Sequence, residues 1–172
     1  MEETSRTRVR CAWAKFRELS QILTKRGVSL KIKGKLYKTC VQRVLVYASE
    51  TWAMKIEDEQ RLERAENAMI RWMCGVTLRD KCAMKGLRER LGIVSVMDVV
   101  RKGRLAWFGH LERKDTSDCV SDCRSMEVVD SRVKTWQDCI NADMARLGLR
   151  REMAQDREKW RSCIVGKPLN PC

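Results

Sequence analysis

Apolar residues recur along this chain with the spacing of amphipathic helices. In residues 5–25, one side of such a helix carries apolar residues and the other carries Arg and Lys; the apolar positions are Ala12, Phe16, Leu19 and Leu23. The same period of about 3.6 residues predicts further helices over 57–75, 80–91, 95–112, 134–148 and 151–164. Several of these segments end at a glycine, which takes the left-handed conformation after a helix at little cost; these are Gly75, Gly92 and Gly148.

A long helix is predicted to start after Ser29 and to run to about Met54, and its character changes halfway. Its first half is amphipathic, and a polar stripe with the spacing i, i+4, i+7, i+11 runs along it; the stripe is Lys31, Lys35, Lys38 and Gln42. Its second half, LVYASETWAM (45–54), is apolar on nearly all sides, which predicts a central, buried helix. The β-branched residues leave a strand over 44–48 as the alternative.

Few residues interrupt these helices. The chain has nine Gly and two Pro among 172 residues, and both Pro lie within the last five residues. A chain so poor in helix breakers favours an all-α fold, and we expect a bundle of about six to eight helices. The pattern divides the chain into a basic helical segment, residues 1–56, a second helical segment, residues 57–165, and a frayed tail, residues 166–172.

The charge of the chain is strongly positive and unevenly distributed. The net charge is +13. Residues 1–56 hold 13 Lys and Arg but 4 Asp and Glu, a net of +9, whereas residues 57–92 and 93–172 carry +1 and +3. Such a balance favours a polyanionic partner, RNA or DNA ahead of an anionic membrane surface. The predicted phosphate contacts are Lys31, Lys35 and Lys38 on the stripe, with Lys33 and Arg43 near its margins; an ordinary solvated helix face is the alternative.

Segments that would place the chain in or across a membrane are not predicted. No uninterrupted run of about 18 apolar residues occurs, so we expect no membrane span. The N-terminal sequence MEETSRTRVR is polar and lacks the apolar core of a secretory signal. We therefore expect a nuclear or cytoplasmic protein whose nine Cys stay reduced.

Histidine and cysteine residues offer little for catalysis or metal binding. The chain has one histidine, His110, so a catalytic Ser-His or Cys-His pair is possible only there. Its place one helical turn from Trp107 favours a packed, hydrogen-bonded side chain. Side chains of the types that bind zinc occur at His110, Cys119, Cys123 and Cys139. Only the C-x3-C pair has the spacing of zinc ligands. Small core residues and exposed thiols are therefore the favoured interpretation of these positions.

Carboxylates are not clustered in the way that polymerases and nucleases need to hold two metal ions. Asp118 and Asp122 share one helix face, which favours a solvated pair, and the acidic run at 57–59 fits the positive end of a helix dipole. Glu50 has no aspartate pair beside it, and we expect it to pair with an Arg or to cap a helix end. No glycine-rich phosphate loop occurs, so we expect no cofactor and no enzymatic activity.

A series of stretches, taken in order, resembles a known protein family. The stretches are AWAKFRELS (12–20), KGKLYKTCV (33–41), VLVYASETWAM (44–54), LERAENAMIRWMCGV (62–76), LRERLGIVSVMDVVRKGRLAWFGHLER (87–113), KTWQDCINADM (134–144) and AQDREKWRS (154–162). Together they resemble the C-terminal end of reverse transcriptases from non-LTR (LINE-type) retrotransposons. The motifs L-x-Y-x-x-E-T-W and W-F-G-H-x-x-R are the most specific parts of this resemblance when they occur in this order.

In that family, a polymerase palm with metal-binding aspartates precedes a helical thumb and a further helical segment. The resemblance implies that residues 1–56 are thumb-like, that the rest follows the thumb, and that the catalytic aspartates have no counterpart here. The chain departs from the family pattern at Ala48, where Gly is usual, and in a shortened linker before KTW (134–136).

The resemblance thus implies a fragment of an RNA-directed DNA polymerase that is inactive by itself. Such a fragment would bind a template–primer-like RNA or DNA duplex through its phosphates, independently of sequence. The remainder of a reverse transcriptase is a further expected partner. A helical remnant without function, or a protein-interaction module with an exposed apolar patch, is the alternative.

Overall fold

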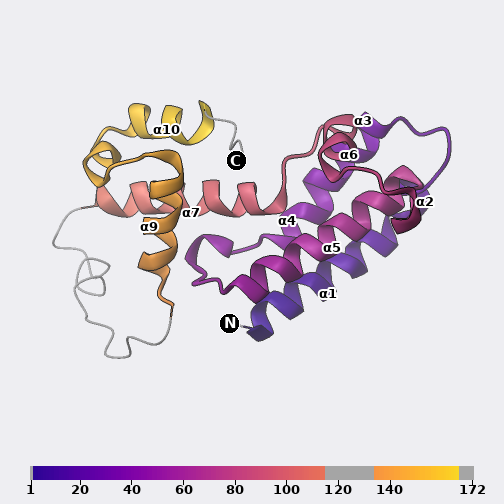
Figure 1. Ribbon diagram of the computed structural model, residues 1–172, viewed down its shortest axis with the longest axis horizontal. Coiled ribbons are helices and arrows are strands. Elements are labelled where there is room, and N and C mark those ends of the chain that lie inside the picture. The colour runs from indigo at the N-terminus through magenta and orange to yellow at the C-terminus, as the bar shows by residue number, and fades with distance from the viewer. Residues whose placement is uncertain (1, 115–133, 167–172) are drawn as a thin grey trace. The chain divides into compact units, whose positions relative to one another are not determined.

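The protein is built from helices, which Figure 1 shows for a computed structural model that describes residues 2–114 and 134–166. Within these ranges every regular element is a helix, so the all-α prediction is confirmed there. These residues form two compact units. Unit 1 takes its residues from Met1–Tyr47 and Lys55–Val99, and unit 2 from Ala48–Met54 and Val100–Cys172. The predicted boundary at residue 56 differs from this division, because the helix after it packs on the first helix of the chain.

Unit 1 centres on two parallel helices, α1 (Glu2–Glu18) and α5 (Ile56–Cys74), which lie side by side in Figure 1. Near one end, the hydroxyl of Ser5 donates to Asp58 (2.6 Å). Near the other end, the ring of Phe16 stacks on that of Trp72. The predicted apolar faces are buried, as shown by Ala12, Phe16, Leu62, Met69 and Met73, each no more than 1% exposed.

Shorter elements complete unit 1. They are α2 (Ser20–Leu23), α3 (Leu30–Leu36), a π-helical turn (Tyr37–Val41), α4 (Gln42–Leu45), a 3-10 turn (Leu78–Asp80) and α6 (Met84–Leu91). The predicted helix over 5–25 is interrupted at Leu19, and the one over 80–91 begins later than expected. Gly75 and Gly92 end α5 and α6 with positive φ, as predicted.

Two helices of unit 1, α3 and α6, approach each other closely at Gly34. A Cβ atom added there would overlap the carbonyl oxygen of Leu91 and lie 2.7 Å from its carbonyl carbon. From the sequence alone, Gly103 suggests a second close helix crossing, because a glycine inside the helix predicted over 95–112 costs about 1 kcal/mol relative to Ala. In unit 2, Gly103 faces the side chain of Glu50, with 3.4 Å from an added Cβ to the Glu50 Cγ, so no backbone approaches it there.

Unit 2 contains most of α7 (Val96–Glu112), together with α9 (Trp136–Leu147) and α10 (Arg157–Gly166). Two 3-10 turns, Ser49–Thr51 and Arg151–Gln155, accompany them. Its core is apolar and consists of Leu105, Phe108, Ile140, Ala154, Trp160 and Ile164. The indole Nε1 of Trp160 donates to the carbonyl of Leu105 (2.9 Å), which satisfies the polar atom of this buried ring.

The LVYASETWAM stretch is neither the predicted helix nor the alternative strand. The helix ends at Leu45, and Ala48 has φ +59°, a left-handed conformation that stops any continuation. In unit 2, the carbonyl of Glu50 accepts a hydrogen bond from the Trp136 indole (2.7 Å). Trp52 is buried as expected, whereas Tyr47 is 62% exposed. Among the described residues, no Arg forms an ion pair with Glu50. The stretch therefore contributes to the packing of the protein through its backbone and its apolar side chains.

The buried face of α7 keeps most of the apolar stripe that the helical period over 95–112 predicts, since Val96, Val100 and Leu111 are buried. Trp107, which the same period places on this stripe, is 38% exposed. The inward positions include Arg104, Leu105 and Phe108, each 1% exposed. A fully buried arginine was not expected from the helical pattern, because charged residues are read as marking the solvent side. The predictions for Cys119, Cys123, Asp118, Asp122 and the tail from residue 167 lie outside the described residues.

Candidate nucleic-acid interface

Four of the five cations predicted to contact phosphates are exposed on unit 1. Lys31 and Lys35 lie on α3, Lys38 on the π-helical turn and Arg43 on α4. Within residues 2–114 and 134–166, none of the four forms an ion pair with a carboxylate. Their charges are therefore presented to solvent, and we refer to Lys31, Lys35, Lys38 and Arg43 as the basic face.

Lys33, the fifth predicted contact, does not belong to the basic face. Its side chain is buried, with 5% of its surface exposed, and its Nζ donates to the carbonyl of Met73 (3.0 Å). Met73 lies in the last turn of α5, where the final carbonyls lack helical partners and the helix dipole favours a cation. Lys33 thus closes the C-terminal end of α5 and is not available to a phosphate.

The π-helical turn explains why Arg43 replaces Gln42 on this face. A regular helix would place Gln42 in line with Lys31, Lys35 and Lys38, as the sequence predicted. The N–H of Gln42 instead donates to the carbonyl of Tyr37, five residues earlier, so the chain carries one extra residue in that turn. The extra residue rotates everything after it by about 100°. Arg43 is thereby placed outward, at the end of the spacing 31, 35, 38, 43.

Gln42 is consequently turned into unit 1, where it is 3% exposed. Its side-chain amide donates to Glu66 (3.1 Å) and to the carbonyl of Val94 (2.9 Å). These bonds tie α4 to α5 and to the segment before α7. The backbone that carries the basic face is therefore fixed on its buried side by hydrogen bonds, and such bonds are stronger in a low-dielectric interior.

Glu66 is the centre of this buried polar network. It is fully buried and also accepts from the backbone N–H of Val96 (3.0 Å) and from Arg88 (3.1 Å). Burial raises the pKa of the Glu66 carboxyl, although the three hydrogen-bond donors and the Arg88 charge act in the opposite direction. The carboxyl is a structural group, since its oxygens are used to join α4, α5, α6 and the start of α7.

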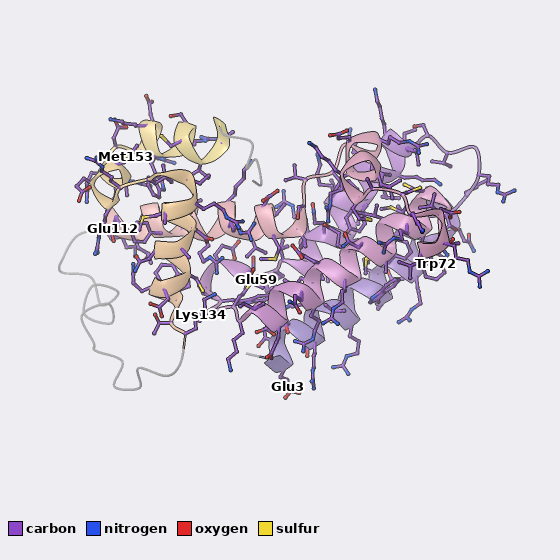
Figure 2. All side chains as sticks on the ribbon, in the orientation of Figure 1. Glu3, Glu59, Trp72, Glu112, Lys134 and Met153 are labelled. Carbon is purple, nitrogen blue, oxygen red and sulfur yellow. The ribbon has the colours of Figure 1, made fainter. Side chains whose placement is uncertain are left out.

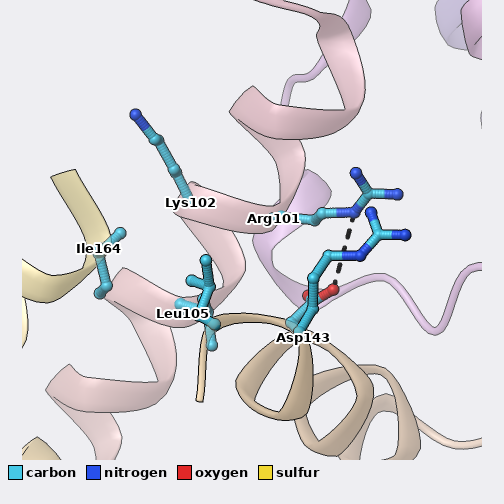
Figure 3. A pocket seen from close by; sticks show the side chains of 7 residues that line it. Arg101, Lys102, Leu105, Asp143 and Ile164 are labelled. Carbon is cyan, nitrogen blue, oxygen red and sulfur yellow. Dashed lines mark ion pairs between the residues drawn. The ribbon is translucent and has the colours of Figure 1, made fainter. Parts of the chain in front are cut away.

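A second buried ion pair lies in unit 2, where Arg104 Nε donates to Asp143 (2.8 Å). Arg104 also donates to the carbonyl of Trp52 (3.4 Å). Figure 3 shows Arg101, on α7, next to the same carboxylate on α9, at 3.8 Å. A cavity beside this ion pair is lined in part by Arg101, Leu105 and Asp143 and measures about 10 Å³. This is room for about one water molecule, which identifies a packing feature and not a ligand pocket.

The remaining candidates for metal or acid–base chemistry are not brought together. His110 is exposed and its ring lies 5.3 Å from that of Trp107, so the predicted packed histidine is wrong. Cys139 is buried and its Sγ donates to the carbonyl of Met54 (3.7 Å). Among the residues that the structure describes, no three His, Cys, Asp or Glu side chains gather as a metal site.

No helix in the described ranges combines the length and apolar character needed to cross a bilayer. The two most specific motifs of the resemblance are only partly buried: Leu45, Trp52 and Phe108 are buried, whereas Tyr47, Trp107 and His110 are exposed. Comparison of the chain with protein-family models, with characterised proteins and with solved structures finds no match.

Proposed function

We propose that this chain binds RNA or DNA through phosphate contacts of the basic face, as the thumb-like part of a non-LTR retrotransposon reverse transcriptase. The observation that carries the proposal is the alignment of four exposed cations along one edge of unit 1, without acidic partners in the described residues. Lys and Arg on such an edge contact phosphates irrespective of base sequence. Polymerase activity belongs, in this proposal, to a palm that the chain does not itself provide.

The dimensions of the basic face suit a short length of one nucleic-acid strand. Twelve residues separate Lys31 from Arg43, which at a rise of about 1.5 Å per residue is roughly 18 Å. Phosphates of one duplex strand advance about 3.4 Å along the axis per nucleotide. The face therefore spans about five nucleotides, which offers a phosphate within reach of each of its cations.

Binding of this kind has a defined dependence on salt. Neutralising Z phosphates of a duplex gives a slope of log affinity against log salt of about −0.9Z. Four contacts therefore give a slope of about −3.6, and affinity falls by roughly 100-fold when salt is raised from about 50 to about 200 mM. A slope near zero would contradict the proposal.

The test replaces Lys31, Lys35, Lys38 and Arg43 together by Gln, which removes the charges from exposed positions and leaves the core intact. We expect the affinity for a fluorescent primer–template duplex to fall, and the salt slope to become flatter by about 3.6, because the phosphate contacts are lost. Fluorescence anisotropy titrations at several salt concentrations measure both quantities.

A matched control separates the basic face from total charge. It replaces four exposed cations of unit 2 by Gln, which changes the net charge by the same amount; these are Arg150, Arg157, Lys159 and Arg161. We expect this variant to bind the duplex nearly as the unchanged chain does. An equal loss in both variants would show that binding follows net charge and has no defined face.

Two further measurements separate the proposal from its alternatives. A polymerase assay with a homopolymer template and Mg²⁺ or Mn²⁺ is expected to show no nucleotide incorporation. Incorporation would require a catalytic site within the chain. An intact, folded chain without duplex affinity even at low salt would instead support a remnant or a protein-interaction module.

A further inference from the structure

A second surface of unit 1 combines exposed aromatic and arginine side chains, on the side where α1 meets α5. Its α1 residues have the spacing i, i+3 and i+7, and its α5 residues have the spacing i, i+4 and i+8, so each set lies on one face of its helix. The ring contact between Trp13 and Trp72, at 5.9 Å, joins the two sets. We call this the arginine–tryptophan surface, and it consists of Arg10, Trp13, Arg17, Arg64, Ala68 and Trp72.

Trp72 is the distinctive residue of this surface. It is 55% exposed, although Trp is a large side chain that folded proteins bury for most of its area. One face of its ring is backed by Phe16, which is fully buried, at a centroid distance of 5.7 Å and an interplanar angle of 24°. Ala68, one turn earlier on α5, is too small to cover the ring. Figure 2 shows Trp72 toward the end of α5.

A stacked contact with Phe16 and a tilted contact with Trp13 fix the orientation of the Trp72 ring before any partner arrives. A ring already held in place loses little conformational freedom on binding. A half-exposed ring that is held in place on a helix pair is the kind of platform on which nucleobases stack. Core packing accounts for the burial of Phe16, but it does not account for the exposure of about half of the Trp72 side chain.

The charged residues around this platform are arginines. Arg10 and Arg17 are exposed and form no ion pair within residues 2–114 and 134–166. Glu18, the residue after Arg17, is paired with Lys15 (2.8 Å). Arg64 donates through Nε to the carbonyl of Gln60 (3.1 Å), which orients its guanidinium. Guanidinium groups bind phosphates in a forked geometry and also stack on aromatic planes.

We propose that the arginine–tryptophan surface binds single-stranded nucleic acid, with one unpaired base stacked on Trp72 and adjacent phosphates held by Arg10 and Arg17. A nucleotide supplies the two groups that complement this surface, a base that stacks on the tryptophan and a phosphate that pairs with the arginines. The surface is distinct from the basic face, which contacts duplex phosphates. The inference shares with the proposed function only the assumption that the partner is nucleic acid.

The test compares Trp72→Ala and Trp72→Phe for binding of a fluorescent oligothymidylate and of a blunt duplex of equal length. Loss of one base–aromatic stack costs about 1–3 kcal/mol, so Trp72→Ala is expected to weaken oligothymidylate binding by about 5- to 150-fold. Trp72→Phe keeps an aromatic face and should retain most of the affinity. Duplex binding should stay unchanged in both variants.

The control is Trp107→Ala, which removes another partly exposed tryptophan in unit 2 and should leave both affinities unchanged. Circular dichroism and thermal unfolding establish that each variant is folded, and Trp72→Phe preserves the test if Trp72→Ala is unstable. Equal oligothymidylate affinity in the unchanged chain and in both Trp72 variants would overturn the inference. So would self-association of the chain that Trp72→Ala abolishes while oligonucleotide binding persists, since it would assign the surface to a protein contact.

Failure of this inference is distinguishable from failure of the proposed function. The variant in which the basic face is replaced by Gln should lose duplex affinity and keep the Trp72-dependent part of oligothymidylate binding. A chain in which Trp72 matters for the single strand, while the basic face does not matter for the duplex, supports this inference alone.

Discussion

Replacing Gly34 by Ala tests how closely α3 and α6 pack in unit 1. Gly34 lies within α3, where Ala is intrinsically more favourable than Gly by about 1 kcal/mol. Helix propensity alone therefore predicts that Gly34→Ala stabilises the protein. The packing predicts the reverse, because the added Cβ would overlap the Leu91 carbonyl group, with its carbonyl carbon at 2.7 Å.

The packing effect is expected to be the larger one. The atoms in the way are backbone atoms of α6, so no side chain can move aside and the two helices must separate. Overpacking of this kind costs about 1–3 kcal/mol, and the backbone obstacle places Gly34 at the upper end, about 3 kcal/mol. After the gain in propensity, a net destabilisation of about 2 kcal/mol remains.

Gly86 provides a matched control on the partner helix. It lies within α6, and a Cβ added there meets nothing within 4 Å. Gly86→Ala should therefore show the propensity effect alone and stabilise unit 1 by about 0.5–1 kcal/mol. Urea unfolding followed by far-UV circular dichroism measures both variants. A Gly34→Ala protein as stable as the unchanged chain, or more stable, would refute the close packing of α3 on α6.

Two further predictions concern the buried ion pairs. The folded pKa of Glu66 lies above its usual value of 4.5. The contribution of the Glu66 carboxyl to stability is therefore fully present below about pH 4.5 and is lost as pH rises through the folded pKa. In Glu66→Gln this pH dependence of stability should disappear. Urea unfolding of both proteins from acidic to neutral pH measures it. In unit 2, Asp143→Ala leaves Arg104 buried and unpaired and should cost about 3–5 kcal/mol, whereas an Arg104→Met/Asp143→Leu double variant should recover most of it. A double variant no more stable than Asp143→Ala in thermal unfolding would contradict this account.

Several elements were predictable because their signals are local. The helix α5 has acidic residues in its first turn, a regular apolar stripe and Gly75 after its last residue, and each of these acts within a few residues. The same is true of α6 with Gly92 and of α9 with Gly148. The exposure of Lys31, Lys35 and Lys38 also followed from the period of a single helix.

The π-helical turn was not predictable in this way. An i+5 turn is intrinsically unfavourable in an isolated helix, and it persists here because both flanking segments are packed. Tyr37 and Val41 are buried, and Gln42 reaches Glu66 and Val94, which are 24 and 52 residues away in sequence. The exchange of Gln42 for Arg43 on the basic face depends on those distant partners.

The sequence by itself determined the helical class, the positive N-terminal third and most helix ends, because hydrophobic period, net charge and glycine termini operate over short distances. Only the tertiary structure decided which cations are buried. Lys33 and Arg104 are buried because their partners, Met73 and Asp143, stand 40 and 39 residues away along the chain. Burial of a charge is stable only when a partner is in place, and no local pattern encodes the position of a partner brought there by folding.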